Sequence, residues 1–462
     1  MRPWFLMAVL ACGGAPETDA PAAAPPAPSK APNVILISLD TVRADRLGAY
    51  GGRAETPNLN MMAAQGARFD VAIANFPETA LSHWAMMTGA LPAVHGNVPG
   101  TGGSRFTGPT LAERLSGAGY ATAAFIGGET LTDRSTGMSR GFQVYDDAYP
   151  WDRKDLKRPG DQVVAAAQGW MKAQQQPYFA FIHLFDAHFP YTPPPPWDTR
   201  YNPGYTGELT GSDADLRPYR DGEKTPTAED IAQVLALYDG ELSELDGIIG
   251  PILQSADSNT IVMVTADHGE SFSHDYWFNH RDALWDGVIR VPLMVRGPGV
   301  KAGHKISTQV ELIDIAPTVL GLLGLPPLEQ VHGQDRTPEL TGKAGAAPGR
   351  PAHSITDPTR PNPQVSVRTA AAKVLIQGTD GVSYDLRRDS AEAHPTPIPA
   401  AVTTAAVQTY QQRLAPVKTK WQGPELPARH PGHEELQRLE SLGYIDKVKG
   451  GDGDPAGAPA PR

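Results

Sequence analysis

The chain has 462 residues, with 40 lysines and arginines against 51 aspartates and glutamates, and a formal net charge of −11 at pH 7. This acidic balance, without a basic run of useful length, argues against a nucleic-acid partner, because a phosphate backbone recruits clustered Lys and Arg. No stretch of about 20 apolar residues occurs, which argues against a membrane-spanning helix. Proline and glycine concentrate in 13–32, 192–226, 341–364 and the last dozen residues, which we interpret as linkers, long loops and a frayed tail.

The first twelve residues combine a basic residue with a short apolar segment and end in Cys12, the only cysteine of the chain. Val9-Leu10-Ala11-Cys12 resembles a bacterial lipobox, in which the cysteine is lipidated and becomes the mature N-terminus. We therefore expect residues 1–12 to be a lipoprotein-type signal and residues 13–32 a Pro/Ala-rich tether. The protein would then be attached to a membrane through the lipidated Cys12, at the periplasmic or outer-membrane face of a bacterial cell envelope. A plain cleaved signal or a chance apolar start is the alternative.

Apolar runs typical of buried strands alternate with helical patterns along most of the chain. The runs are 33–39, 120–126, 178–185, 260–266 and 291–297, and the helical patterns include 110–119 and 227–253. In the segment 227–253 apolar residues such as Ile231, Leu235 and Tyr238 recur every three to four positions, as on the buried face of a helix. This alternation predicts an α/β sandwich with a largely parallel central sheet.

After about residue 345 the pattern changes to short strands at 365–377 and 382–387, followed by a helical segment around 401–414. We interpret this part as a smaller α+β domain. The expected organisation is a main domain over 33–345, a small C-terminal domain over 346–447 and a flexible tail over 448–462.

Polar side chains suited to chemistry follow three of the predicted strands. Asp40 ends the first strand, Asp186 and His188 follow the strand 178–185, and Asp267-His268 follow the strand 260–266. Ligands collect at the carboxyl ends of strands in an open parallel sheet. Carboxylate and imidazole groups suit a divalent cation, so Asp40, Asp267 and His268 are predicted to bind one.

Thr79 is a candidate fourth ligand and nucleophile, just before a helical run predicted over 81–87. A hydroxyl bound to a cation loses its proton more easily and becomes a nucleophile near neutral pH. The free N–H groups of the first helical turn would help to hold an anionic oxygen. Taken alone, however, a threonine at this position is more typical of a simple helix N-cap.

Seven motifs follow one another over roughly residues 31–390: "PNVILISLDTVRADRLGAYGG", "TPNLNMMAAQGARFDVAIA", "MMTGALPAVHG", "FIHLFDAHFPYTPPPP", "VTADHGESFSH", "RVPLMVRGPGV" and "ELIDIAPTVLGLLGLP". In this order they resemble the sulfatases of the alkaline phosphatase superfamily. The resemblance implies an alkaline-phosphatase-like catalytic domain that holds a divalent metal ion (Ca, Mg, Mn or Zn) and a nucleophile. It also implies hydrolysis of sulfate esters, or of phosphate esters in related branches.

The resemblance assigns roles position by position. Asp40, Asp267 and His268 match metal ligands. His188 matches the histidine that binds the anion or protonates the leaving oxygen, and His280 stands where the family often has a basic residue touching the sulfate.

The chain also departs from the family pattern. Thr79-Ala80-Leu81-Ser82-His83 stands where the family has Cys or Ser, any residue, Pro, a small residue and Arg, the first of which is oxidised to formylglycine. Thr41 replaces the second aspartate of an Asp-Asp pair, for which Asp45 is a weak substitute ligand. No Lys-x-His motif occurs in the segment 125–135, where one might hold the anion.

A threonine cannot follow the formylglycine route, in which a hydrate expels sulfate by breaking a carbon–oxygen bond. A threonyl ester must instead be cleared by water that attacks sulfur or phosphorus. We therefore expect a metal-dependent hydrolase of sulfate or phosphate esters that acts on a small molecule or a glycan. Two alternatives are a phosphoryl-group transferase acting on envelope glycans or lipids, and a non-catalytic lipoprotein that keeps the fold for binding.

Overall fold

The computed structural model describes residues 31–92, 106, 108–148, 157–329, 331–343, 349–357 and 363–414. The predicted signal with Cys12, nearly all of the tether, the boundary expected between residues 345 and 346, and the tail lie outside these residues. Among the described residues, no helix combines the length and the apolar character needed to cross a membrane.

A nine-stranded sheet forms the centre of the described structure. Its order is β10 (His304–Ile306), β2 (Ala67–Ile73), β9 (Arg290–Arg296), β6 (Thr260–Ala266), β1 (Asn33–Leu39), β5 (Tyr178–Leu184), β3 (Ala121–Phe125) and β4 (Val144–Asp146), with β11 (Val310–Glu311) also paired to β2. Only β9 runs antiparallel to its neighbours, β6 and β2, among the described pairs of this sheet. The prediction of an α/β fold with a largely parallel sheet is confirmed.

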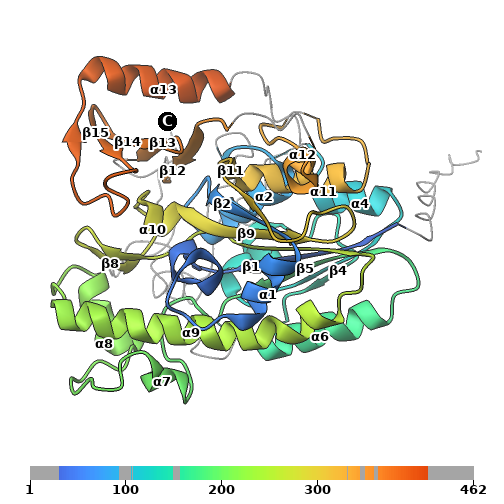
Figure 1. The fold of residues 1–462 in the computed structure, drawn as a ribbon, viewed down its shortest axis with the longest axis horizontal. Coiled ribbons are helices and arrows are strands. Elements are labelled where there is room, and N and C mark those ends of the chain that lie inside the picture. Colours follow the sequence, from blue (N-terminus) through green and yellow to red (C-terminus); the bar gives the residue numbers. More distant parts are fainter. Residues whose placement is uncertain are drawn as a thin grey trace, which may run out of the picture.

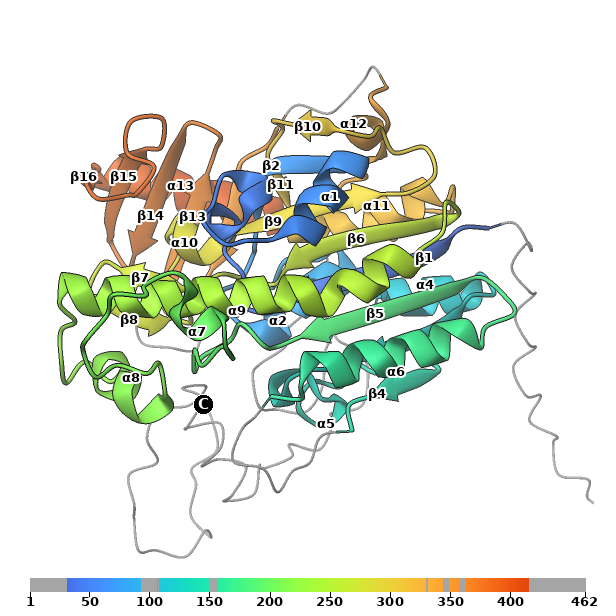
Figure 2. The same cartoon turned by 60° about the horizontal axis from the view of Figure 1, so that its bottom comes forward.

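Helices cover both faces of this sheet (Figures 1 and 2). One layer contains α1 (Pro57–Gln65), α6 (Gly160–Lys172) and α9 (Ala228–Ser255), and the other contains α2 (Thr79–Thr88), α4 (Leu111–Gly117) and α11 (Ile315–Leu322). The helix predicted over 227–253 is α9, which begins after Thr227 because the Thr227 hydroxyl and the Asp230 carboxylate form a capping box. With both faces covered, the middle strands are buried on both sides, and Val34 to Leu39 of β1 have no exposed surface.

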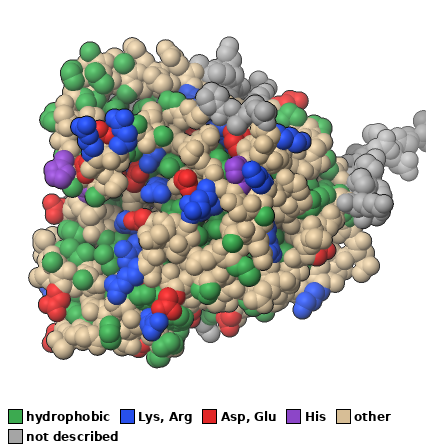
Figure 3. Space-filling view, viewed as in Figure 1, with side chains coloured by type: hydrophobic (Ala, Val, Ile, Leu, Met, Phe, Trp, Pro, Cys, Tyr) green, Lys and Arg blue, Asp and Glu red, His purple; other side chains and the backbone are tan. Residues whose placement is uncertain are grey.

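Shorter elements complete the main part of the chain. They are the hairpin of β7 (Ser271–Ser273) and β8 (Tyr276–Asn279) and the helices α5 (Asp133–Thr136), α7 (Trp197–Arg200), α8 (Asp213–Arg220), α10 (Asp286–Ile289) and α12 (Thr337–Thr341). On the face drawn in Figure 3, basic and acidic side chains are interspersed.

The C-terminal region contains an antiparallel sheet crossed by one helix (Figure 1). The strands are β12 (Ala352–Ile355), β13 (Gln364–Arg368), β14 (Ala372–Gln377), β15 (Asp380–Asp385) and β16 (Thr396–Pro397), and the helix is α13 (Ala400–Leu414). The segment 365–377, expected as one strand, forms two. The chain turns between them because the Thr369 hydroxyl accepts from the amide of Ala372 at 3.0 Å.

Buried ion pairs join this region to the central sheet. Glu311, at the end of β11, accepts bonds from Arg350 at 2.8 Å and from Arg413 of α13 at 2.5 Å. Asp286, the first residue of α10, pairs with Arg368 at 2.7 Å and with Lys373 at 3.1 Å. The ion pairs of Glu311 and those of Asp286 hold the C-terminal sheet beside the edge of the nine-stranded sheet.

Candidate active site

The site lies where three central strands end. In the parallel ladder, Leu39 of β1 is in register with Leu184 of β5 on one side and Ala266 of β6 on the other. The residues that follow these positions therefore leave the sheet side by side, at its carboxyl edge. Asp40 lies between Asp267 and the loop that carries His188.

Asp40, Asp267 and His268 form a buried group of possible metal ligands. One ligand atom from each residue lies within 4.8 Å of the others, and none of the three residues has exposed surface. Asp40 Oδ1, Asp267 Oδ2 and His268 Nε2 have no hydrogen-bond partner among the described residues. Because His268 Nδ1 lies 3.0 Å from the carbonyl oxygen of Gly269, which can only accept, the neutral ring carries its proton on Nδ1 and presents a lone pair on Nε2. These open donors fit a divalent cation.

The electrostatics of the group also favour a cation. Burial raises the pKa of Asp40 to about 6. The pKa of Asp267 is raised as well, first by burial and then by the charge of Asp40. Burial opposes the charged form of His268, yet the charges of Asp267 and Asp40 raise its pKa. Two carboxylates that repel each other in a dry site gain from a positive ion between them.

Thr79 is the first residue of α2 and belongs to this group. Its hydroxyl donates to Asp40 Oδ2 at 3.1 Å, and the residue is fully buried. The N-cap of α2 is Glu78, whose backbone is extended, so the interpretation of Thr79 as an N-cap is wrong. The helix predicted over 81–87 begins two residues earlier, at Thr79, whose hydroxyl bonds to Asp40.

The second aspartate of the family's Asp-Asp pair is missing here. Neither Thr41, which replaces it, nor Asp45 supplies a metal ligand atom in its place. Thr41 adopts a left-handed backbone with φ of 57°, and its amide donates to Asp267 Oδ1 at 3.2 Å. Asp45 accepts two bonds from the guanidinium of Arg43, at 2.9 and 2.8 Å, and is not part of the metal group. The suggestion that Asp45 is a substitute ligand is therefore wrong, and the Thr41 backbone orients Asp267.

His188 lies on the loop after β5. Its ring stacks on that of Phe185, with centroids 4.2 Å apart and planes 16° from parallel, and its Nδ1 lies 2.9 Å from the carbonyl oxygen of Phe189. Nδ1 therefore carries a proton, whereas the buried Nε2 has no partner among the described residues. Burial, followed by the charge of His280, lowers the pKa of His188 well below its usual value. The neutral ring presents a lone pair on Nε2.

His280 is held by a carboxylate. Its Nδ1 lies 3.2 Å from Glu270 Oε1, and the other oxygen of Glu270 accepts from the Tyr191 hydroxyl at 2.8 Å. The ring centroid of His280 lies 5.5 Å from that of His188 and 4.3 Å from that of His268. The structure thus places His280 beside the predicted metal ligand His268, and His188 beside His280. Burial, before any charge, lowers the pKa of His280 well below its usual value.

Asp186, the other polar residue noted after β5, is turned toward a helix. Its Oδ1 accepts from the amide of Gly160 at 2.9 Å, at the start of α6. A carboxylate at a helix N-terminus satisfies a free N–H group and complements the helix dipole. Asp186 therefore stabilises the packing of α6 against the loop.

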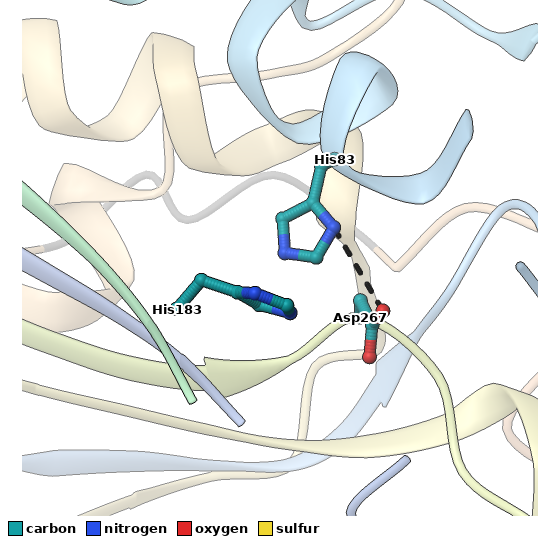
Figure 4. A group of neighbouring side chains, drawn as sticks. All are labelled: His83, His183 and Asp267. Atoms are coloured by element: carbon teal, nitrogen blue, oxygen red, sulfur yellow. Dashed lines mark ion pairs between the residues drawn. The ribbon is translucent and has the colours of Figure 1, made fainter. Parts of the chain in front are cut away.

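A second group, which sequence reasoning missed, shares Asp267 with the first and adds His83 and His183 (Figure 4). His83 Nδ1 lies 2.7 Å from the carbonyl oxygen of Thr79, and its Nε2 lies 2.8 Å from the Ser38 hydroxyl. His183 Nε2 lies 3.1 Å from Asp40 Oδ2. Burial lowers the pKa of His83 to about 3 and that of His183 to about 4.

These two neutral histidines hold the residues around the metal group Asp40, Asp267 and His268 in place. Both ring nitrogens of His83 are occupied, and His183 holds one oxygen of Asp40, so the other oxygen stays available. The available signal for His83 was its place at the arginine of the family signature. His183 faces inward in the apolar strand, which no local pattern reveals.

Comparisons with known proteins identify the family of this chain. Residues 32–325 match the sulfatase family. The chain therefore belongs to the sulfatases, a family of the alkaline phosphatase superfamily whose members typically bind a divalent metal. The chain is similar to arylsulfatase K of Gallus gallus, with 28% identity over 403 residues that cover 74% of this chain and 72% of that protein. It is also similar to an arylsulfatase of Clostridium perfringens, with 24% identity over 370 residues, or 65% of this chain and 77% of that protein.

Two solved structures show the same fold. The phosphonate monoester hydrolase of Agrobacterium radiobacter superposes with a TM-score of 0.67 at 21% identity, covering 87% of this chain and 99% of that one. A protein solved in complex with its substrate, D-glucosamine-2-N,6-O-disulfate, superposes with a TM-score of 0.63 at 17% identity, covering 90% of this chain and 99% of that one.

Proposed function

We propose that this sulfatase-family protein is a metal-dependent hydrolase of sulfate or phosphate esters that uses Thr79 as its nucleophile. One observation carries the proposal. The Thr79 hydroxyl lies at the start of α2 and donates to Asp40, which together with Asp267 and His268 forms a buried set of open ligand atoms. A buried hydroxyl beside such a set is placed for activation.

Asp40, Asp267 and His268 would hold the cation, with Thr79 as a fourth ligand. Carboxylate oxygens admit Ca, Mg or Mn, and the imidazole of His268 is compatible with Mn or Zn. When bound, such a cation supplies positive charge that lowers the pKa of the hydroxyl and offsets the negative charge of the ester.

In the first step Thr79 Oγ1 attacks the sulfur or phosphorus of the ester. The hydroxyl proton passes to Asp40 Oδ2, which accepts its hydrogen bond at 3.1 Å. The bond between sulfur or phosphorus and the leaving oxygen breaks, and His188, protonated from solvent at Nε2, donates that proton to the leaving oxygen.

His280 would bind the anionic group of the substrate. Burial keeps the ring neutral in the free protein, and a bound anionic ester, together with the adjacent carboxylate of Glu270, would favour the imidazolium form, in which Nε2–H donates a hydrogen bond to an ester oxygen. Glu270 is itself held by Tyr191, so the pair keeps one orientation.

In the second step water attacks the sulfur or phosphorus of the threonyl ester. The attacking water gives one proton to His188, the bond to Thr79 Oγ1 breaks, Asp40 returns its proton to Oγ1, and free sulfate or phosphate leaves. The substrate would be a small molecule or a glycan carrying such an ester.

Metal analysis combined with a substrate panel tests this proposal. The purified protein is assayed for bound metal and for turnover of chromogenic sulfate monoesters, phosphate monoesters and phosphodiesters, before and after chelation. We expect one bound divalent cation and hydrolysis that is lost with the metal. Transfer of the group to a glycan or lipid acceptor in preference to water would indicate a transferase, and metal binding without turnover of any ester would indicate a binding protein.

We further propose that Cys12 anchors the protein in a bacterial cell envelope. The support is the lipobox-like segment 9–12 and the Pro/Ala-rich segment after it. The protein should fractionate with membranes, and Cys12→Ser should release it or block its processing. Recovery of the unchanged protein in the soluble periplasmic fraction would contradict lipidation.

A further inference from the structure

We propose that Lys157 is a positioning residue that holds His188 in place for proton transfer. Its Nζ donates to the carbonyl oxygen of Asp186 at 2.9 Å and to that of Pro190 at 2.8 Å. These two carbonyls lie two residues before and two residues after His188. The ammonium therefore joins both ends of the short segment that carries the histidine. This inference rests on the proposed role of His188 in catalysis.

Lys157 reaches this position from a distant part of the sequence. It forms an isolated antiparallel bridge with Gly128, and the amide of the next residue, Arg158, donates to Gly127 at 2.8 Å. Gly127 and Gly128 belong to the segment 125–135, in which the chain has no Lys-x-His motif. The bridge thus brings a lysine alongside the segment that lacks one of its own.

Gly128 links the bridge to the imidazole through a ring contact. A Cβ atom on Gly128 would come within 2.6 Å of the Phe185 ring, so only glycine allows the ring to lie there. Phe185 stacks on His188 at 4.2 Å. The glycine beside Lys157 therefore leaves room for Phe185 to stack on one face of His188, while Lys157 itself bonds the carbonyls on either side.

Further contacts hold the loop that carries His188 in the same position. Asp186 Oδ1 accepts from the amide of Gly160, and a Cβ on Gly160 would come within 2.5 Å of Asp186 Oδ2, so the start of α6 fits closely against this loop. Glu241 of α9 accepts from the amide of Thr192, just beyond the segment, at 2.6 Å. Burial lowers the pKa of Lys157, and the charges of Glu241, Asp186 and Asp40 raise it. The ammonium lies among carboxylates and within electrostatic reach of the metal group.

Removing the ammonium leaves two carbonyl oxygens without their donor. The loop can then relax, and His188 Nε2 loses its fixed position even though the rest of the fold is intact. Arginine can donate to two carbonyls and should restore part of the function, whereas methionine fills similar space without donating. Lys172, exposed in the last turn of α6, offers a matched control.

The test compares Lys157→Met, Lys157→Arg and Lys172→Met in the full-length, metal-loaded protein. Esters with a poor alkoxide leaving group and a good nitrophenolate leaving group are hydrolysed in parallel. A proton donor matters for the alkoxide and little for the nitrophenolate. For the alkyl ester we expect Lys157→Met to lower kcat by roughly 10- to 100-fold, a part of the roughly 100- to 10,000-fold that a positioned general acid supplies. The nitrophenyl ester should lose less than about threefold, with KM unchanged.

A second arm is independent of turnover. Nitrogen-15 NMR of labelled histidines, with the His188 signals assigned through His188→Ala, reports the imidazole environment directly. The His188 signals should shift in Lys157→Met, return toward their parental positions in Lys157→Arg and stay unchanged in Lys172→Met. This arm distinguishes failure of the inference from failure of the proposed function, because it gives an answer even if no ester is turned over.

Two results would overturn the inference. One is a folded Lys157→Met protein whose His188 signals match those of the parent. The other is an equal loss of kcat for both leaving groups, which indicates general damage to the site. In a His188→Ala background, Lys157→Met should add less than about a twofold further loss, because the two residues act in one unit.

Discussion

The Thr79 hydroxyl and one oxygen of the Asp40 carboxylate, Oδ2, lie 3.1 Å apart in a fully buried site. The same oxygen lies 3.1 Å from His183 Nε2, so it is held from two sides. The other oxygen, Oδ1, has no partner among the described residues. The two oxygens of one carboxylate thus differ, and the Thr79 hydroxyl lies beside the open ligand atom.

The metal group is tested by Asp267→Ala. The substitution should lower both the bound metal and the melting temperature, because metal binding favours the folded state and the remaining carboxylate loses its counter-charge. Metal content and thermal unfolding, each measured with and without a chelator, give the answer. Asp45→Ala is the matched control, since Asp45 pairs with Arg43 outside the group and its removal should leave the metal content unchanged. Equal metal in Asp267→Ala and the parent would remove Asp267 from the site.

Replacement of His83 by arginine, the residue of the family signature, should destabilise this protein. The His83 ring bonds the Thr79 carbonyl and the Ser38 hydroxyl in a site without exposed surface, and burial keeps it neutral. A guanidinium at this position places a charge in a buried site and removes the hydrogen bond between the His83 ring and the Ser38 hydroxyl. We expect this to lower the free energy of unfolding by roughly 2 kcal/mol or more. Urea unfolding measures the difference. Ser38→Ala, which removes one bond only, should cost about 1 kcal/mol. Parental stability of His83→Arg would show that the pocket accepts the arginine.

The Glu311 cluster should make stability depend on pH. Burial opposes ionisation of Glu311, yet the charges of Arg413 and Arg350 lower its pKa from 4.5 to about 2. Because the folded-state pKa lies below the unfolded one, this contribution is fully present above pH 4.5 and is lost as the pH falls toward 2.

Glu311→Gln tests this directly through urea unfolding between pH 7 and about pH 3. The variant should be less stable by about 3 kcal/mol at neutral pH, as expected when one partner of a buried ion pair is removed. The difference in the free energy of unfolding between variant and parent should become smaller as the pH falls. Parallel curves for variant and parent would show that Glu311 does not carry the dependence.

The sequence predicts best those elements whose pattern lies within one short segment of the chain. Strands buried on both faces need continuous apolar runs, so 33–39 and 260–266 predict β1 and β6 without a shift, and the polar residues after them lie at the same sheet edge. The strand Ala67–Ile73 was harder to recognise because Arg68 and Asp70 interrupt its apolar pattern, as expected near the edge of a sheet.

The supporting contacts could not be predicted in the same way. His183 and Asp40 are far apart in the chain and meet only through the pairing of β1 with β5. Lys157 is well separated from the His188 loop in the chain and bonds to that loop only in the folded structure, where it also bridges to Gly128. Whether Thr79 is the N-cap or the first residue of α2 depends on where the helix begins, which propensity does not resolve. As a companion to the alanine variant described next, Thr79→Ser keeps the hydroxyl and should therefore retain part of the hydrolase activity.

The most direct test of the central claim is the turnover of Thr79→Ala against the parent at equal metal content. If Thr79 is the nucleophile, the variant should stay folded, lose about 1 kcal/mol of stability with its hydrogen bond to Asp40, and lose several orders of magnitude (about 10⁴-fold or more) in kcat. Near-parental turnover would contradict the account, because water would then have to be the nucleophile.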